Sequence, residues 1–272
     1  MDDHEAAANR LVQGLRPPVD VLVDLAGLVV HGSRIPFEAD DPAHVMLLSF
    51  ASKQHDHLHS VRVLVDAGQG ADATIIARTM LEGTAQLLWA LNHRPDGPEL
   101  WWWYAAVMDW RQLRENELNG MPVDPEQWRI VVELLDKYGA RYLSAKARKD
   151  REEGKPLPTD PYRRSWLDLD VRSMLATIRG ELHYDLVYRT ASERIHWNPR
   201  AMLRSLNIVN GVPRGYRRHD SRGALMALIA GFYAMHQALE VLDQAFGLGL
   251  EPRLASVLAK FEAERPADGR HD

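Results

Sequence analysis

The chain of 272 residues contains no cysteine, which excludes disulfide bonds and thiolate metal sites. It also lacks a glycine-rich phosphate loop, the Gly-x-Ser-x-Gly turn of serine hydrolases and the glutamate-bearing His-x-x-x-His helix of metallopeptidases. Its longest apolar run, from Ala224 to Met235, is too short to cross a bilayer. The N-terminal residues are acidic and unlike a secretory signal. We therefore expect a cytoplasmic protein that makes no contact with a membrane.

The remaining composition is that of an ordinary globular protein, with 46% hydrophobic and 26% charged residues. The formal net charge of −5 argues against a protein that coats nucleic acid over its whole surface. It leaves room for a local basic site.

The apolar residues recur at helical spacing, and no segment has the alternation of a β-strand. The region 207–220, with its glycines and a proline, is predicted to be a loop. Helices are predicted at 4–15, 19–31, 42–66, 72–93, 101–119, 125–149, 166–178, 184–197, 221–245 and 253–264.

We expect these helices to form one all-α domain over residues 1–272, a multi-helix bundle without a significant sheet. Its predicted parts are N-terminal helices over 1–67, a core over about 70–245, a linker-like loop at 148–164 and a short C-terminal helix over about 253–264.

The predicted helix at 72–93 is apolar on nearly every face, so we expect it to be the most buried one. Its polar residues Arg78, Glu82 and Gln86 fall on one stripe. The stripe is either a solvated edge, because long charged side chains are seldom fully buried, or a polar face that meets another helix inside the core.

The stretch 184–199 places ionisable side chains on one helical face. Seven residues turn a helix through about 700°, so Arg189 and His196 lie within about 20° of each other, roughly 10.5 Å apart. A permanent cation and an imidazole that titrates near neutral pH therefore point the same way. Alternatively, Arg189 pairs with Glu193 at i,i+4, and His196 merely ends the helix.

Arginines accumulate directly after this stretch, with Asp220 as the one acid among them. They are Arg194, Arg200, Arg204, Arg214, Arg217, Arg218 and Arg222. This segment predicts a local positive patch on an acidic chain, suited to an RNA backbone. The alternative interpretation is that the segment is a solvated, arginine-rich loop that pairs with acidic helices elsewhere in the chain.

A histidine-rich run at residues 55–59 (His-Asp-His-Leu-His) is the other conspicuous cluster. Its His-Asp pair is similar to that of the metal-dependent HD phosphohydrolases, and His55 and His59 at i,i+4 are able to share one metal ion. That family needs a further histidine and aspartate, and His44 and Asp109 lack the surrounding pattern. We therefore expect a solvated histidine run and no bound metal or cofactor.

Two family resemblances follow from these motifs. The segment Arg78-Thr79-Met80-Leu81-Glu82, combined with Tyr188-x3-Ser192-x3-His196 and a helix beginning at Trp166, resembles a family of uncharacterised bacterial helical proteins over about residues 45–245. That family is classed as a domain of unknown function. Arg189 and His196 resemble the Arg-x(4–6)-His signature of the HEPN (higher eukaryotes and prokaryotes nucleotide-binding) superfamily.

The HEPN resemblance implies a helical homodimer that cleaves RNA without a metal ion, in a toxin or phage-defence system with an antitoxin or other defence partner. It implies catalytic roles for Arg189 and His196. The supporting polar residues would be Arg78, Glu82, Tyr188 and Ser192, and the RNA-binding residues would be Arg194, Arg200, Arg204, Arg214, Arg217 and Arg218.

Two alternatives stay open. The same arginine, glutamate, serine and histidine residues are able to form a structural polar network in a non-catalytic helical interaction module. The third function is that of an HD-type metal phosphohydrolase at residues 55–59.

Overall fold

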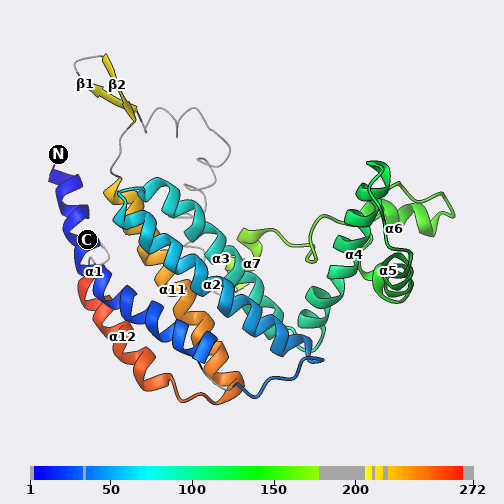
Figure 1. The fold of residues 1–272 in the computed structure, drawn as a ribbon, viewed down its shortest axis with the longest axis horizontal. Helices are drawn as coiled ribbons and strands as arrows, with labels where there is room; N and C mark the ends of the chain where they lie inside the picture. Colours follow the sequence, from blue (N-terminus) through cyan, green and yellow to red (C-terminus); the bar gives the residue numbers. More distant parts are fainter. Residues whose placement is uncertain (1–2, 33–34, 178–205, 210–211, 217–219, 266–272) are drawn as a thin grey trace. The chain divides into compact units, whose positions relative to one another are not determined.

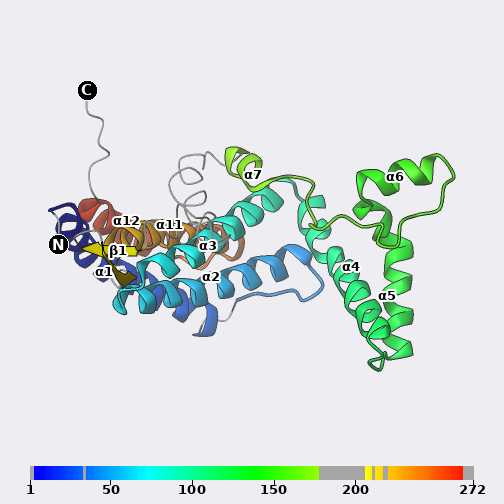
Figure 2. The ribbon, with the colours of Figure 1, turned by 90° about the horizontal axis from the view of Figure 1, so that it is seen from above.

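The computed structural model of the chain describes residues 3–32, 35–177, 206–209, 212–216 and 220–265 (Figures 1 and 2). The predicted all-α class is confirmed. The helices are α1 (Asp3–Gly27), α2 (Pro42–Asp66), α3 (Gly70–Asn92), α4 (Asp96–Leu118), α5 (Pro125–Tyr138), α6 (Ala145–Glu152), α7 (Val171–Thr177), α11 (Ser221–Phe246) and α12 (Glu251–Glu264). A π-helical turn, η1 (Leu28–Gly32), follows α1, and a 3₁₀ turn, η2 (Gly139–Tyr142), follows α5.

The contacts group the chain into two compact units. The first comprises Met1–Glu38, Leu47–Leu88 and Val171–Asp272, and the second comprises Ala39–Met46 and Trp89–Asp170. Such units describe how the contacts cluster and do not test whether the chain folds as one domain, so the single domain expected over residues 1–272 stays a prediction.

The first unit has its core where α1, α11 and α12 pack against one another (Figure 1). Thirteen of the 26 residues of α11 are buried, a larger share than in α3, so the prediction that α3 is the most buried helix is wrong. The polar stripe of α3 limits its burial, whereas the alanines and glycines of α11 let neighbouring helices approach closely. Phe232 of α11 stacks on Phe261 of α12 with ring centroids 3.7 Å apart.

Helix α11 is also long and apolar enough, by length and composition, to cross a membrane. However, 61% of its apolar window is buried inside the structure, as in the core helix of a globular domain. Asp220 caps the start of this helix, because its side chain accepts a hydrogen bond from the Gly223 N–H at 2.9 Å. Gly247, with φ of +61°, ends it in the left-handed conformation.

The two N-terminal helices predicted on either side of Pro17 and Pro18 form one continuous helix, α1. A proline inside a helix costs about 3 kcal/mol because it removes a hydrogen bond and crowds the preceding turn. Leu15, Val19 and Leu22 each have 0% exposure, and burying such a side chain contributes about 1.5–3 kcal/mol. The continuous apolar face therefore outweighs the local penalty.

The second unit contains two helices where one was predicted over 125–149. Helix α5 ends at Gly139, where an added Cβ would lie 3.2 Å from the hydroxyl oxygen of Tyr162. Ser144 then starts α6, because its hydroxyl accepts a hydrogen bond from the Ala147 N–H at 3.2 Å. Close packing at the glycine and the serine cap together break the helix.

The predicted linker at 148–164 is fastened to α4. The guanidinium of Arg111 donates hydrogen bonds to Asp160 at 2.9 Å, to the carbonyl oxygen of Tyr162 at 3.1 Å and to that of Arg163 at 3.0 Å. The end of this segment is therefore held against the helices of the second unit.

Two further boundaries differ from the prediction. Helix α7 begins at Val171 rather than at Trp166, because Trp166 and Leu167 are buried in irregular backbone before it. The predicted loop at 207–220 contains an antiparallel hairpin, formed by β1 (Leu206–Val209) and β2 (Val212–Tyr216). Pro213 is tolerated because both strands of a two-stranded sheet are edge strands. This hairpin is the one sheet in the described part of the chain.

Candidate functional site

The predicted catalytic pair, Arg189 and His196, lies outside the described residues, as do Tyr188 and Ser192. The same holds for Arg194, Arg200, Arg204, Arg217 and Arg218. Arg214 belongs to β2, of which the backbone is described. These site predictions therefore stay predictions, and the described site residues are those on α3.

The polar stripe of α3 is half-buried along its length. Arg78, Glu82 and Gln86 all have intermediate exposure, and the Nε atom of Arg78 is shielded from solvent. Because Arg78 and Glu82 are one helical turn apart, their opposite charges occupy one partly covered face. The stripe is therefore not a fully solvated edge.

A different face of α3 carries a buried polar network that connects three helices. The Nε2 atom of Gln54 on α2 donates to the carbonyl oxygen of Met80 at 2.8 Å and to the hydroxyl oxygen of Thr84 at 3.0 Å. The Thr84 hydroxyl donates to Met80 at 3.0 Å and lies 3.4 Å from the carbonyl oxygen of Ala234 on α11. These hydrogen bonds fix the axial positions of α2, α3 and α11, because a displaced helix would strand buried polar atoms.

Next to this network, a cavity of about 370 Å³ opens between α2 and α3. It is lined by Ser49, Phe50, Lys53, His57 and Thr79, together with Gln54 and Gly83. Burial and the neighbouring Lys53 ammonium lower the pKa of His57 below 6.5. The neutral imidazole of His57 is therefore favoured over the charged form at pH 7.

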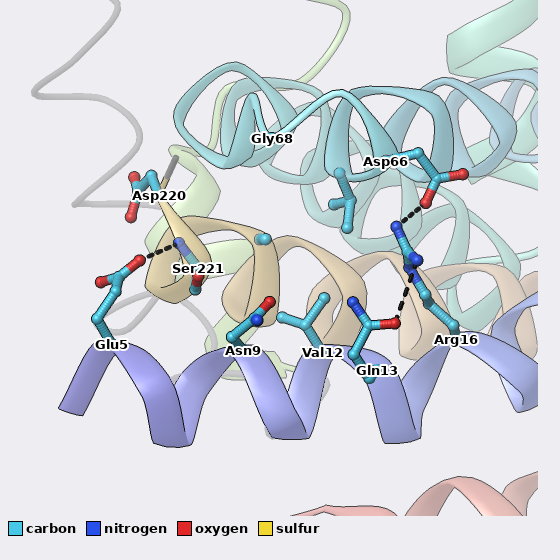
Figure 3. Close-up of a pocket in the computed structure, with 11 residues that line it drawn as sticks. Glu5, Asn9, Val12, Gln13, Arg16, Asp66, Gly68, Asp220 and Ser221 are labelled. Carbon is cyan, nitrogen blue, oxygen red and sulfur yellow. Dashed lines mark hydrogen bonds and ion pairs between the residues drawn. The ribbon is translucent and has the colours of Figure 1, made fainter. Parts of the chain in front are cut away.

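Figure 3 shows a second pocket of about 540 Å³, between α1, the end of α2 and the start of α11. Glu5 accepts a hydrogen bond from the backbone N–H of Ser221 at 2.9 Å. Arg16 pairs with Asp66 and donates to Gln13 at 3.2 Å. With Asp220, three carboxylates line this pocket and Arg16 is its one guanidinium. The protein's own carboxylates occupy the start of α11, so this pocket does not favour an RNA phosphate.

A third pocket of about 640 Å³ lies where the end of α1 meets α2, and it gathers three histidines. The sequence pairs His55 with His59, and the structure adds His31 from η1, whose ring lies 5.3 Å from that of His55. Sequence reasoning missed His31 because it is remote along the chain and no spacing rule relates it to residues 55–59.

The residues proposed to complete an HD-type site have other surroundings. His44 lies 3.6 Å from the carboxylate of Asp41. The side chain of Asp56 is 69% exposed, and Asp109 on α4 is exposed. An HD site needs the histidine and the adjacent aspartate to converge on one ion, and the exposed Asp56 does not favour that arrangement.

In the second unit, half-buried tryptophans line an open hollow of about 510 Å³. Trp101, Trp102 and Trp103 of α4 contribute to it with Leu134 and Trp166. Trp103 also stacks on Tyr138, with ring centroids 4.1 Å apart. Such aromatic faces accept apolar groups and nucleobases.

The model of a family of unknown function (DUF5677) matches residues 44–212. The matched segment runs from α2 through β1 and contains both Arg78 and Glu82 and the stretch 184–199. No curated protein and no solved structure matches the chain significantly.

Proposed function

The chain belongs to the family of unknown function DUF5677, and we propose that it is a HEPN-like protein that binds RNA and cleaves it without a metal ion. The observation that carries the proposal is the spacing of Arg189 and His196, which places a guanidinium and an imidazole on one helical face. We further propose that the protein acts in the cytoplasm as a homodimer in a bacterial toxin or phage-defence system.

The chemistry would be an attack by the ribose 2′-hydroxyl on the adjacent phosphorus. His196 would remove the 2′-hydroxyl proton as a general base, or protonate the departing 5′-oxygen as a general acid. Arg189 would hold the non-bridging phosphate oxygens and stabilise the charge of the transition state. The P–O5′ bond breaks as the P–O2′ bond forms, which yields a 2′,3′-cyclic phosphate and a 5′-hydroxyl.

The half-buried stripe of α3 supports a role for Arg78 and Glu82 beside this pair. A partly desolvated guanidinium interacts with phosphate more strongly than one in bulk water. Glu82, on the same face, is able to orient a cationic or imidazole side chain. On the same predicted helix, Ser192 would place a hydroxyl group about one turn before His196. Tyr188 would place another about two turns before it.

The RNA backbone would be held by the arginines between Arg194 and Arg218, because they concentrate positive charge on a chain of net charge −5. A homodimer would place two such segments around a shared two-fold axis, so residues two helical turns apart would be able to serve one phosphate. The antitoxin or defence partner of such a system would bind the same face.

A non-catalytic interaction module is the second candidate function. The network of Gln54, Thr84 and Met80 favours it, because this network shows polar side chains on α3 used to position helices. In that case the polar residues of the stretch 184–199 would have the same structural role.

The test incubates purified full-length protein with mixed RNA in the presence of a chelator. The variants are His196→Ala and Arg189→Ala, and the matched controls are His4→Ala and Arg253→Ala, which replace exposed residues of α1 and α12. We expect cleavage by the wild type and both controls and its loss in both site variants, with unchanged melting temperatures.

RNA binding by fluorescence anisotropy separates the candidate functions. Binding that persists while cleavage is lost supports the catalytic roles. A wild type that neither binds nor cleaves RNA, and a His196→Ala variant that melts at a much lower temperature, would make His196 structural and favour the interaction module. Cleavage abolished by the chelator and by His55→Ala would favour the HD phosphohydrolase.

A further inference from the structure

The tryptophan-lined hollow of the second unit follows one face of α4. Its α4 lining includes two neighbouring rows with i, i+4, i+7 spacing, which are Trp101, Ala105 and Met108 in one row and Trp102, Ala106 and Asp109 in the other. Seven residues of helix rise about 10.5 Å. The hollow therefore has an aromatic end at the tryptophans and a carboxylate about two helical turns further along.

Small side chains leave space between these two ends. Ala105 is exposed and Ala106 has 3% exposure, and neither side chain extends beyond its Cβ atom. Leu134, from the neighbouring helix α5, and Trp166, from the irregular segment before α7, line the hollow as well. The two alanines thus lie beside larger apolar side chains, and the resulting volume of about 510 Å³ is in the range of small-molecule sites.

Neighbouring rings hold the aromatic end in place. Trp103 stacks on Tyr138, and Trp102 lies at 87° to Trp103, with ring centroids 6.3 Å apart. Trp166 meets the ring of Trp89 edge to face, with centroids 5.9 Å apart. Trp102 and Trp103 nevertheless stay only half-buried. Ring surface that is fixed before binding and still partly open to solvent loses little entropy when an apolar ligand packs on it.

The hollow also has a charge preference. Among the described residues that line it, the exposed Asp109 is the one that carries a charge at pH 7. The faces of indole rings are electrostatically negative and attract cations. Since no arginine or lysine belongs to this described lining, nothing in it opposes that attraction. Both features favour a positively charged ligand and disfavour a phosphate.

We propose that this hollow binds a small aralkyl amine, an organic cation with an aromatic body and an ammonium group at the end of an alkyl chain. The aromatic body would pack against the half-buried tryptophans, the alkyl chain would lie over Ala105 and Ala106, and the ammonium would pair with Asp109. An acid of the same shape would instead meet a like charge at Asp109. All lining residues belong to the second unit, and the site is independent of the proposed RNA cleavage.

The test titrates purified full-length protein with three ligands of matched shape, the cation phenylbutylammonium, the neutral phenylbutanol and the anion phenylbutyrate. Tryptophan fluorescence reports on the second unit, which contains seven of the eight tryptophans, and calorimetry gives an independent affinity. We expect one ligand per chain. The ammonium should bind about three- to tenfold more tightly than the alcohol, because an exposed ion pair and a cation–π contact each contribute modestly. Phenylbutyrate should bind most weakly.

Two variants with matched controls separate the charge from the shape of the hollow. Asp109→Asn should remove the preference for the ammonium and leave the affinity for phenylbutanol unchanged. Its control, Glu117→Gln, neutralises an exposed carboxylate of α4 outside the lining and should keep the preference. Ala105→Leu should weaken all three ligands by roughly tenfold or more, because the larger side chain fills the hollow. Its control is Ala140→Leu, at an exposed position of η2 outside the lining.

All four substituted residues are exposed, so the variants should keep the wild-type melting temperature. Equal affinities for the ammonium and the alcohol, a preference that survives Asp109→Asn, or no binding by the wild type would each overturn the proposal. Self-association of the wild type that Ala105→Leu abolishes and Ala140→Leu retains would assign the hollow to a second copy of the chain, and would overturn it too. These titrations contain no RNA, so their outcome is separate from that of the cleavage test.

Discussion

Replacing Gln54 tests the buried network that holds α2, α3 and α11 together. Gln54 is 3% exposed, and its Nε2 atom donates at 2.8 Å to Met80 and at 3.0 Å to Thr84. In Gln54→Ala, each lost hydrogen bond costs about 0.5–1.5 kcal/mol. The space vacated by the side chain adds a further penalty of about 1 kcal/mol. We therefore expect the free energy of unfolding to fall by about 2–4 kcal/mol.

Two further variants make this expectation specific. Gln54→Met loses the same two hydrogen bonds as Gln54→Ala, but it keeps the side-chain volume and removes Oε1, which has no hydrogen-bond partner in the described part of the chain. It should therefore cost less than Gln54→Ala. Gln112→Ala removes an exposed glutamine of α4 whose side chain donates a hydrogen bond to Asn116, and it should cost under about 0.5 kcal/mol.

The assay is urea denaturation followed by far-ultraviolet circular dichroism. Tryptophan fluorescence is unsuitable, because seven of the eight tryptophans lie within residues 89–166, in the second unit. Equal losses in Gln54→Ala and Gln112→Ala would refute the network as a source of stability.

Two other predictions concern one helix junction and one titrating group. In Gly97→Ala, the new Cβ would lie 2.3 Å from the backbone carbonyl oxygen of Ala90 in α3. The free energy of unfolding of the second unit, measured by tryptophan fluorescence, should therefore fall by about 1–3 kcal/mol. A variant as stable as the wild type would contradict this contact. Burial opposes protonation of His236, but Glu240 outweighs it and raises the pKa of His236 above 6.5. The resulting stabilisation is fully present below about pH 6.5 and disappears as the pH rises through the raised value. The difference in melting temperature between wild type and His236→Gln should therefore shrink from acidic to alkaline pH, and a constant difference would count against the charge interaction.

The helical periodicity predicted most of the fold because burial of a continuous apolar face leaves a clear repeat in the sequence. Helix α2 and the Asp220 cap of α11 follow from local residues alone. The passage of α1 through Pro17 and Pro18 does not, since it depends on tertiary burial that offsets the local proline penalty. The end of α5 at Gly139 does not follow from local residues either, because it reflects the ring of Tyr162 packed against this glycine.

The candidate sites show the same division. Helical periodicity predicts that Arg78, Glu82 and Gln86 share one face of α3. It does not predict which other element packs on that face, and this packing determines how exposed the three side chains are. The pairing of His55 with His59 follows from i,i+4 spacing. The proximity of His31 to His55 depends on the packing of the end of α1 against α2, which has no sequence signature of its own.

The chemical ends of the RNA fragments test the central claim most directly. Wild-type protein, with chelator present, should convert a labelled oligoribonucleotide into fragments that carry a 2′,3′-cyclic phosphate and a 5′-hydroxyl, and His196→Ala should leave the oligonucleotide intact. These ends follow from attack by the 2′-hydroxyl with proton transfer by His196. Intact RNA with the wild type, or fragments with 3′-hydroxyl and 5′-phosphate ends, would contradict the proposed function.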